Sequence, residues 1–373
     1  MARKIYIAAT NQHIGKTTTT LGLSAVIQKM GYKTGYCKPV GQECVDFNGQ
    51  KVDKDAFLFS KVLGFDLDPN IHNPVRLPRG TTIQFLDNPN GLPFSKKLHQ
   101  AVNRLDVRHD VVVFEGTGHP AVGSVVGLSN AVVARKIGAS VILIVEGGIG
   151  NTIDRLELSM ALFREQGVPI AGVIINKVLP NKLGKVRYYV EGWLKQRNIP
   201  LLGLVPFEKS MTNPNMNTIM KAVDGIPIVN HLQLSKPIEG IMAASSIEYQ
   251  DLSILNNQLL VVNINQYEKT INKLIDKYQN QEINQTFLGG ILILTNTEGK
   301  IDLKEFPKHS NYFNQHHIPI ITSSLDGFDC CFKINNLKVK INPKTSWKVD
   351  KAIQLFEKHI DLTPIFQMEN CLV

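Results

Sequence analysis

Short, almost wholly apolar runs alternate with helix-forming stretches through the first half of the chain, and this alternation constrains the fold most strongly. The strand candidates are residues 5–9, 34–38, 111–115, 140–145, 172–176 and 201–205, and the helix candidates are residues 16–30, 53–63, 130–137, 152–166 and 182–197. Strands that are apolar on both sides are buried on both faces, as in a parallel sheet covered by helices. We therefore predict an α/β fold with a doubly wound, mostly parallel sheet.

The composition changes after about residue 225, where Asn, Gln, Ile and Lys become more common. Three further strand candidates and two helix candidates follow, at residues 259–264, 267–279, 290–295, 318–323 and 346–358. A chain of 373 residues is too long for one ordinary core. We predict a first domain over residues 1–225 and a second, smaller α/β domain over residues 235–373. The stretch 69–90 is interpreted as a long excursion outside the core, because it is rich in Pro, Asn and Gly.

The strongest local motif is Ala9-Thr10-Asn11-Gln12-His13-Ile14-Gly15-Lys16-Thr17, between a strand candidate and a helix candidate. A phosphate chain needs inward backbone N–H groups, a helix N-terminus, one cation and one hydroxyl for a metal. Gly15 permits the close approach, Lys16 can reach the phosphates, and Thr17 can bind Mg²⁺. The motif predicts a nucleotide site of the P-loop type, although Thr10 replaces the first glycine of the usual G-x-x-x-x-G-K-T pattern.

Two acidic residues are candidates for the same site. Glu115 ends the apolar run 111–114, and ligands of open α/β sheets bind at the carboxyl ends of the strands. Asp55 lies at the start of a helix candidate. Each has an alternative interpretation as a capping carboxylate. With Thr17 they would form an oxygen site for Mg²⁺, an ion that also relies on water and substrate phosphates.

The next segment, residues 31–42, reads Gly-Tyr-Lys-Thr-Gly-Tyr-Cys-Lys-Pro-Val-Gly-Gln. It resembles dethiobiotin synthetase, and still more the amino-terminal region of long phosphotransacetylases. The resemblance covers about residues 3–215 and includes Glu115-Gly116, Glu146-Gly147-Gly148, Asn176-Lys177 and Gly203-Leu204-Val205-Pro206. The loop of that family reads G-T-D-x-x-V-G-K-T, so Ala9 replaces its glycine and Asn11 its aspartate.

The resemblance implies binding of ATP and Mg²⁺. Lys16 matches the loop lysine and Lys38 a lysine that helps to bind carbamate and phosphate, so both are candidate catalytic residues. Asn176 matches an asparagine at the adenine edge, although by itself it reads as a strand-end turn residue. The candidate nucleotide-binding residues are Asn11, Gly15, Lys16, Thr17, Thr18, Asn176 and Pro206, and the candidate Mg²⁺ ligands are Thr17, Asp55 and Glu115.

Departures from the family concern the second substrate. Gln42 replaces a serine that contacts the substrate of the synthetase, and Thr117 and His119 depart from its E-G-A-G-G sequence. His119 is interpreted either as a polar ligand or proton carrier near the phosphate, or as a structural histidine. ATP binding is compatible with these departures, whereas the diamine substrate of the synthetase is not predicted.

The second domain resembles the DRTGG domain of long phosphotransacetylases through residues 289–295 and 318–321, although the Asp-Arg-Thr-Gly-Gly sequence itself is absent. That domain is regarded as a regulatory or interaction module. We therefore predict a nucleotide-responsive regulatory ATPase, which acts slowly on ATP and has an unknown small-molecule acceptor or protein partner. The alternative is an ATP-dependent ligase or carboxylase that activates a carboxylate or carbamate, as dethiobiotin synthetase does.

The net charge of +9 comes from scattered lysines and arginines, which favours phosphate ligands over nucleic acid. The five cysteines form no disulfide framework, so we expect a reduced, cytoplasmic compartment. No apolar run approaches the roughly 18 residues needed to cross a bilayer, and no membrane partner is predicted. The resemblance also implies a homodimer.

Overall fold

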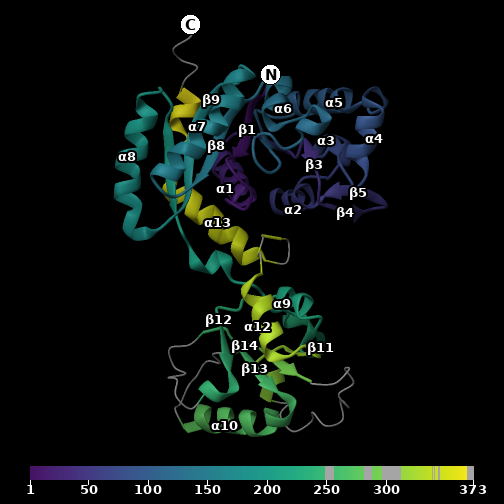
Figure 1. Ribbon diagram of the computed structural model, residues 1–373, viewed down its shortest axis with the longest axis vertical. Helices are drawn as coiled ribbons and strands as arrows, with labels where there is room; N and C mark the ends of the chain where they lie inside the picture. Colours follow the sequence, from purple (N-terminus) through teal and green to yellow (C-terminus); the bar gives the residue numbers. More distant parts are fainter. Residues whose placement is uncertain are drawn as a thin grey trace. The chain divides into compact units, whose positions relative to one another are not determined.

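The computed structural model describes residues 1–247, 256–280, 288–295, 312–337, 339, 341–342 and 345–367. The chain divides into two units. Unit 1 comprises Met1–Glu208 and Ile341–Val373, and unit 2 comprises Lys209–Lys340 (Figure 1). Unit 2 is therefore inserted, in sequence, between two segments of unit 1.

Unit 1 is built on a six-stranded parallel sheet with the order β10-β9-β8-β1-β7-β2. The strands are β1 (Arg3–Ala9), β2 (Thr34–Cys37), β7 (Val111–Glu115), β8 (Ser140–Glu146), β9 (Ile170–Val178) and β10 (Leu201–Pro206). Strands β7 and β8 pair with opposite sides of β1, so the strand order reverses there and a ligand crevice is expected at the carboxyl ends. The predicted doubly wound, mostly parallel α/β sheet is confirmed.

Helices cover both faces of this sheet because its strands are apolar on both sides. One core packs α5, α6, α7 and α8 against the sheet, and the other packs α1 and the C-terminal segment against the opposite face. The helices of unit 1 are α1 (Lys16–Lys29), α2 (Lys54–Leu63), α3 (Pro69–His72), α4 (Thr81–Asp87), α5 (Phe94–Asp106), α6 (Asn130–Ile137), α7 (Gly150–Glu165), α8 (Leu183–Lys195), α13 (Ser346–His359) and α14 (Thr363–Gln367).

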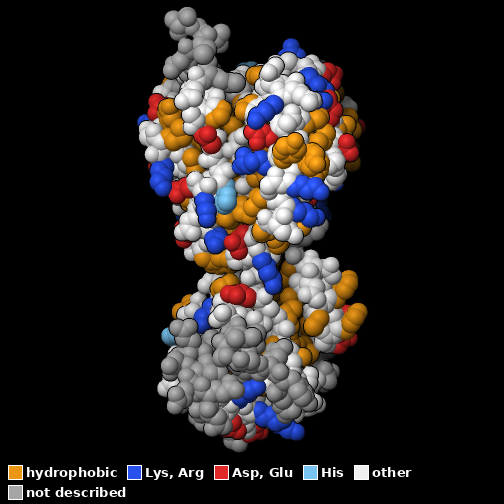
Figure 2. All heavy atoms as spheres, turned by 90° about the vertical axis from the view of Figure 1, so that its left-hand side faces the viewer, with side chains coloured by type: hydrophobic (Ala, Val, Ile, Leu, Met, Phe, Trp, Pro, Cys, Tyr) orange, Lys and Arg blue, Asp and Glu red, His pale blue; other side chains and the backbone are white. Residues whose placement is uncertain are grey.

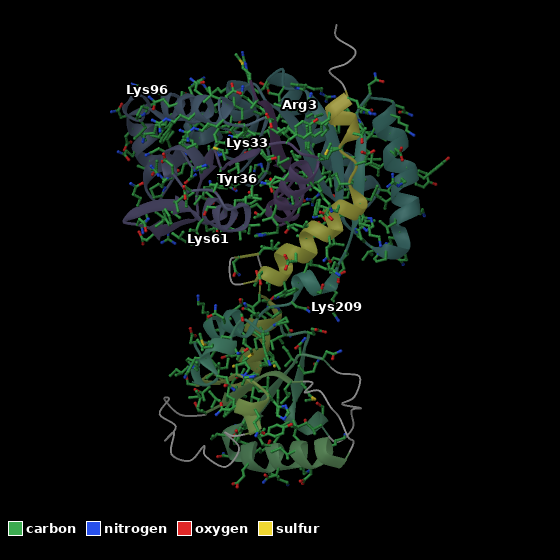
Figure 3. The ribbon with its side chains drawn as sticks, turned by 180° about the vertical axis from the view of Figure 1, so that it is seen from behind. Arg3, Lys33, Tyr36, Lys61, Lys96 and Lys209 are labelled. Carbon is green, nitrogen blue, oxygen red and sulfur yellow. The ribbon has the colours of Figure 1, made fainter. Side chains whose placement is uncertain are left out.

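Helix α13 belongs to unit 1, not to the second domain in which the sequence analysis placed it. It packs along α1, and a Cβ added to Gly22 would lie only 2.4 Å from the ring of Phe356. The chain then pairs with the edge strand β10 through an antiparallel bridge between Ile360 and Gly203. Arg3 donates to the carbonyl of Ile365 at 2.8 Å, beside the C-terminal helix in Figure 3. The C-terminal segment thus completes the second face of the sheet.

The segment after β2 extends unit 1 beyond the sheet. It forms β3 (Val40–Gly41) and β6 (Val75–Arg76), which pair in parallel, and the antiparallel hairpin of β4 (Cys44–Phe47) and β5 (Gln50–Asp53). The interpretation of residues 69–90 as an excursion outside the core is wrong for its first part. Asn73 and Val75 are fully buried, because β6 pairs with β3 and contributes Val75 to the first apolar core, and Asn73 directly precedes this strand.

Unit 2 contains a five-stranded sheet with the order β11-β15-β14-β13-β12, in which only β11 is antiparallel to its neighbour. Two apolar cores cover the sheet, so the predicted second, smaller α/β unit is present. Its elements are α9 (Met216–Ala222), β11 (Ile226–Val229), β12 (Gly240–Ala243), β13 (Gln258–Asn263), α10 (Tyr267–Asn280), β14 (Leu288–Leu294), β15 (Ile320–Ser323) and α12 (Gly327–Asn335).

Among the described residues, no helix is both long enough and apolar enough to cross a membrane. Figure 2 shows one face of the molecule, on which lysines and arginines are dispersed among acidic and apolar side chains instead of forming one basic area.

Candidate functional site

The loop between β1 and α1 is shaped by one glycine and one asparagine. Gly15 precedes α1 with a φ of 96°, a left-handed conformation that favours glycine. A Cβ at this position would lie 2.5 Å from the side-chain nitrogen of Asn176. That nitrogen donates to the carbonyl of Ile14 at 2.7 Å, and the side-chain oxygen of Asn176 accepts from the backbone N–H of Lys177 at 2.9 Å. Asn176 therefore ties the end of β9 to the loop.

Lys16, the first residue of α1, reaches across to the segment that follows β7. Its ammonium donates to the carbonyl of Gly118 at 2.7 Å. The buried side chain of Asn130 holds this segment by accepting from the N–H of Thr117 at 2.9 Å and donating to its carbonyl at 2.7 Å. The hydroxyl of Tyr6 also donates to the Asn130 oxygen, at 2.7 Å. The position of Lys16 is thus defined by a hydrogen-bonded segment and not by a free loop.

Glu115 lies at the carboxyl end of β7 and is completely buried. One of its carboxylate oxygens accepts from the hydroxyl of Thr17 at 2.9 Å, and the other accepts from the hydroxyl of Tyr36 at 2.9 Å. Tyr36 stacks on Phe59 in the interior of unit 1, where Figure 3 labels it. Burial raises the pKa of Glu115, while the nearby ammonium of Lys38 acts to lower it.

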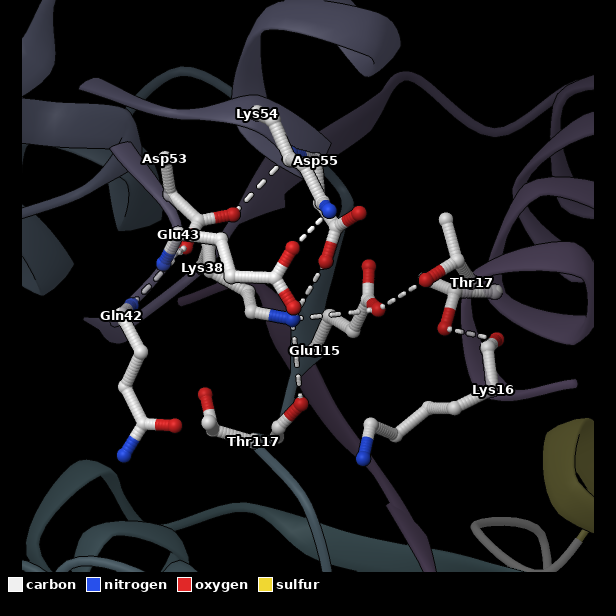
Figure 4. A network of polar contacts seen from close by, with 12 residues as sticks. Lys16, Thr17, Lys38, Gln42, Glu43, Asp53, Lys54, Asp55, Glu115 and Thr117 are labelled. Atoms are coloured by element: carbon white, nitrogen blue, oxygen red, sulfur yellow. Dashed lines mark hydrogen bonds and ion pairs between the residues drawn. The ribbon is translucent and has the colours of Figure 1, made fainter. Parts of the chain in front are cut away.

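Lys38 follows β2 and joins both acidic candidates. Its ammonium lies 2.8 Å from a carboxylate oxygen of Asp55 and 3.2 Å from one of Glu115 (Figure 4). It also donates to the carbonyl of Gly116 at 3.3 Å. Burial acts to lower the pKa of Lys38, but the charges of Asp55, Glu115 and Asp53 outweigh burial and raise the pKa well above its ordinary value. Lys38 is therefore a permanent cation at neutral pH.

A second buried carboxylate, Asp53, was not identified from the sequence. It caps the start of α2 by accepting from the N–H of Asp55 at 2.9 Å, and its other oxygen accepts from the N–H of Gln42 at 3.0 Å. The N–H of Asp53 in turn donates to the side chain of Asn73 at 3.0 Å, and Asn73 donates to the carbonyl of Lys38 at 2.9 Å. These bonds fix the backbones that carry Lys38 and Asp55. The Asp-Lys-Asp sequence at a helix start was the one signal for Asp53, whereas nothing in the sequence pointed to Asn73.

The structure therefore brings Lys16, Thr17, Lys38, Asp55 and Glu115 together, and it places Gly15 and Asn176 beside them at the loop. The other candidates contribute less. Asn11 is exposed, and its side chain accepts only the neighbouring N–H of Gln12 among the contacts described, at 2.8 Å. Thr18 is half-buried in the first turn of α1, and Pro206 ends β10 opposite Val178 of β9.

His119 is exposed, and its Nδ1 accepts from the N–H of Ala121 at 3.3 Å. This contact gives the ring a local structural role. The contact is compatible with both interpretations of His119 made from the sequence.

The donor set suits Mg²⁺ by its chemistry. A hydroxyl from Thr17 and carboxylates from Asp55 and Glu115 are hard oxygen donors of the type that this ion prefers. Among the described residues, no group of three or more His, Cys, Asp or Glu side chains could hold a metal ion by itself. A divalent ion here would consequently depend on phosphate oxygens of a nucleotide as well.

Comparison with known proteins agrees with this geometry. A family model described as an AAA domain matches residues 3–215, more than half of the chain. The chain belongs to this AAA-domain family. It has a P-loop nucleotide-binding, ATPase-like fold of the dethiobiotin synthetase type, as the sequence resemblance indicated.

Individual relatives differ in how much of their length is matched. The ATP-dependent dethiobiotin synthetase BioD of Clostridium acetobutylicum is 24% identical over 211 residues, which are 55% of this chain and 86% of the relative. A probable cobyric acid synthase of Methanocaldococcus jannaschii is 25% identical over 268 residues, 63% of this chain and 53% of the relative. A phosphate acetyltransferase of Nitrosomonas europaea is 25% identical over 268 residues, 69% of this chain and 37% of the relative. The chain thus spans about half of the synthase and little more than a third of the acetyltransferase.

The relationship to dethiobiotin synthetases and phosphotransacetylases is confirmed by these matches. The DRTGG-like character of the second unit and the homodimer stay predictions.

Proposed function

We propose that this protein is a Mg²⁺- and ATP-dependent enzyme of the ligase type. It would transfer the terminal phosphoryl group of ATP to an oxygen of a carboxylate or carbamate, after which a nucleophile displaces phosphate. The observation that carries this proposal is a second lysine, Lys38, which is buried beside the metal-ligand candidates, in addition to the half-buried loop lysine, Lys16. Besides neutralising Asp55 and Glu115, this second cation can stabilise a phosphoryl group in transfer.

The roles follow from the charges in the reaction. A phosphoryl group in transfer carries negative charge on its equatorial oxygens, and catalysis consists mostly of positioning and electrostatic stabilisation. Lys16, at the helix start, would contact the β- and γ-phosphates. Thr17, Asp55 and Glu115 would hold Mg²⁺, whose charge neutralises the phosphate chain. Lys38 would contact the transferred group and an anionic acceptor.

The names of the relatives support the same class of reaction. One is an ATP-dependent synthetase and another a probable synthase. We expect the acceptor to differ from that of dethiobiotin synthetase, because Gln42 replaces a serine that contacts its substrate and Thr117 departs from its E-G-A-G-G sequence. The hydroxyl of Thr117 donates to the carbonyl of Val40, two positions before Gln42, and the side chains of Gln42 and Thr117 are our candidates for acceptor selection (Figure 4).

The test is an ADP-release assay with ATP, Mg²⁺ and bicarbonate, with and without a small-molecule extract of cells. We expect ADP release to rise with the extract, together with consumption of one metabolite detected by mass spectrometry. Lys38→Met should abolish this stimulated release. Stimulation that is equal in Lys38→Met and wild type would contradict the assigned role of Lys38.

A second candidate function is a nucleotide-responsive regulatory ATPase. It is favoured by the insertion of unit 2 between Glu208 and Ile341, because α13, which resumes unit 1 after the insertion, packs on the helix that begins with Lys16. A conformational change at the nucleotide site would thereby be transmitted to α13 and to the segment that connects α13 to unit 2. In the same assay this function predicts slow ADP release that no extract stimulates and no consumed metabolite.

A further inference from the structure

We propose that the ammonium of Lys38 and the divalent metal ion compete for the same two carboxylates, Asp55 and Glu115. Lys38 neutralises these carboxylates when no metal is bound and leaves them when the metal arrives. The inference rests on the proposed MgATP site and adds to it a switch: the catalytic lysine becomes available to the phosphoryl group only after the metal has bound.

The contacts of Lys38 are the first support. Its ammonium lies within 3.2 Å of oxygens from both Asp55 and Glu115, and the Glu115 oxygen that it approaches also accepts from Thr17. All three metal-ligand candidates are therefore linked to this ammonium directly or through one shared oxygen (Figure 4). The shared Glu115 oxygen already accepts two hydrogen bonds, from Thr17 and from Lys38, so a metal ion bound to it would displace at least one of them.

The charges are the second support. Asp55 and Glu115 carry two negative charges, and Lys38 supplies one positive charge to them. The side chains of Lys38 and Glu115 are 5% and 0% exposed, so water screens their interaction weakly. Adding a dication while the ammonium stays would place two cations against the same oxygens, and their repulsion would be strong in this buried position. When the ammonium of Lys38 leaves the carboxylates, this repulsion is removed. The ammonium can then contact the phosphates of the nucleotide.

The backbone around Lys38 indicates which part moves. The N–H of Lys38 donates to the carbonyl of His72 at 2.8 Å, and its carbonyl accepts from Asn73 at 2.9 Å. Both partners come from the buried segment before β6. Because the main chain of Lys38 is held by hydrogen bonds on both sides, only its side chain moves when the metal ion binds. The flexible four-carbon stem allows the ammonium to leave the carboxylates.

The experiment measures Mn²⁺ affinity without nucleotide, from the free-ion signal in electron paramagnetic resonance. The variants are Lys38→Met and Lys38→Gln, and the matched control is Lys51→Met, which removes an exposed lysine paired with Asp46. We expect Mn²⁺ to bind the Lys38 variants about tenfold more tightly than wild type or more, and the control to be unchanged. Unchanged or weaker Mn²⁺ binding by both folded variants would overturn the inference, because a lysine that only organises the ligands would give that result.

A measurement on the wild-type chain covers the case in which neither variant folds. Acetylation of Lys38 by an amine-reactive ester is followed by mass spectrometry with and without Mn²⁺. We expect Mn²⁺ to accelerate labelling of Lys38 and leave that of Lys51 unchanged, since the ammonium leaves its carboxylates. Labelling of Lys38 that is unchanged or slowed by Mn²⁺ would overturn the inference.

Failure of this inference is distinguishable from failure of the proposed function. If wild type binds MgATP but its Lys38 variants gain no affinity for Mn²⁺, only the competition is wrong. If wild type binds no MgATP, the nucleotide function itself is wrong.

Discussion

The side-chain amide of Asn176 donates a hydrogen bond of 2.7 Å to the backbone carbonyl of Ile14, although 162 positions separate the two residues in the chain. This bond connects the end of β9 to the loop that precedes Lys16. The family resemblance assigned Asn176 to the adenine edge of the nucleotide, whereas the contacts of its side chain are with the loop and with its own strand end. These two roles make different predictions.

We expect Asn176→Ala to weaken the binding of ATP and GTP by similar factors. The substitution leaves the buried carbonyl of Ile14 without its donor, which costs about 1–3 kcal/mol and loosens the loop whatever the base. Calorimetric titration with each nucleotide measures the two affinities. A loss confined to ATP would instead assign Asn176 to base recognition.

The packing of α13 on α1 predicts opposite effects for two helical glycines. We expect Gly22→Ala to lower the free energy of unfolding by about 1–3 kcal/mol, because the added methyl group collides with Phe356. The matched control is Gly192→Ala in α8, where an added Cβ meets no atom within 4 Å. That change should stabilise the protein by about 0.5–1 kcal/mol through helix propensity. Urea unfolding measures both, and a stabilising Gly22→Ala would contradict the observed packing.

The division into units predicts how the chain tolerates shortening. Truncation after residue 225 should leave an insoluble or unfolded product, because it removes the buried side chains of Phe356, Ile360, Leu362 and Ile365. At about 1.5–3 kcal/mol each, their loss is comparable to the whole stability of a domain. Joining Glu208 to Ile341 through a Gly/Ser linker should instead give a folded unit that binds nucleotide. Circular dichroism and nucleotide titration compare the two chains, and a stable, nucleotide-binding truncation product would show that α13 is dispensable.

The proposed metal ligands predict a selective defect. Glu115→Gln and Asp55→Asn keep the shape of each side chain but remove one negative charge from the metal ligands. We expect both to weaken the binding of ATP in the presence of Mg²⁺ by more than they weaken it in the presence of EDTA. Glu157→Gln, on the exposed side of α7, is the control. Equal losses under the two conditions would identify Asp55 and Glu115 as structural residues.

Much of the sheet could be predicted because its strands are buried on both faces and are therefore apolar throughout. The strands that carry Lys38, Glu115 and Asn176 were located in this way. The loop with Gly15, Lys16 and Thr17 was recognisable because phosphate binding demands a particular order of residue types. Lys38, by contrast, acquired its role only through the family resemblance, since a lysine after a strand is common. Asp55 was a weak candidate by itself, because an acid at a helix start is usually a cap.

Two features were not predictable for physical reasons. The apolar face of α13 indicates that it packs against something, but no pattern distinguishes the sheet of unit 1 from that of unit 2. Asn73 lies in a Pro- and Asn-rich stretch that resembles a surface loop, and only its buried contacts with Asp53 and Lys38 show its function. Helix α5, by contrast, does have a recognisable pattern, because Leu98, Val102 and Leu105 recur at helical spacing.

The central claim is that Lys16 and the residues around it form a site for MgATP. Calorimetric titration of wild type, Lys16→Ala and the control Lys185→Ala with a non-hydrolysable ATP analogue and Mg²⁺ tests this claim most directly. Lys185 is exposed on α8 and distant in sequence from the loop. We expect wild type and Lys185→Ala to bind one nucleotide per chain with the same affinity, and Lys16→Ala to lose binding by at least about 100-fold while it stays folded. Equal affinity of Lys16→Ala and wild type would contradict the claim.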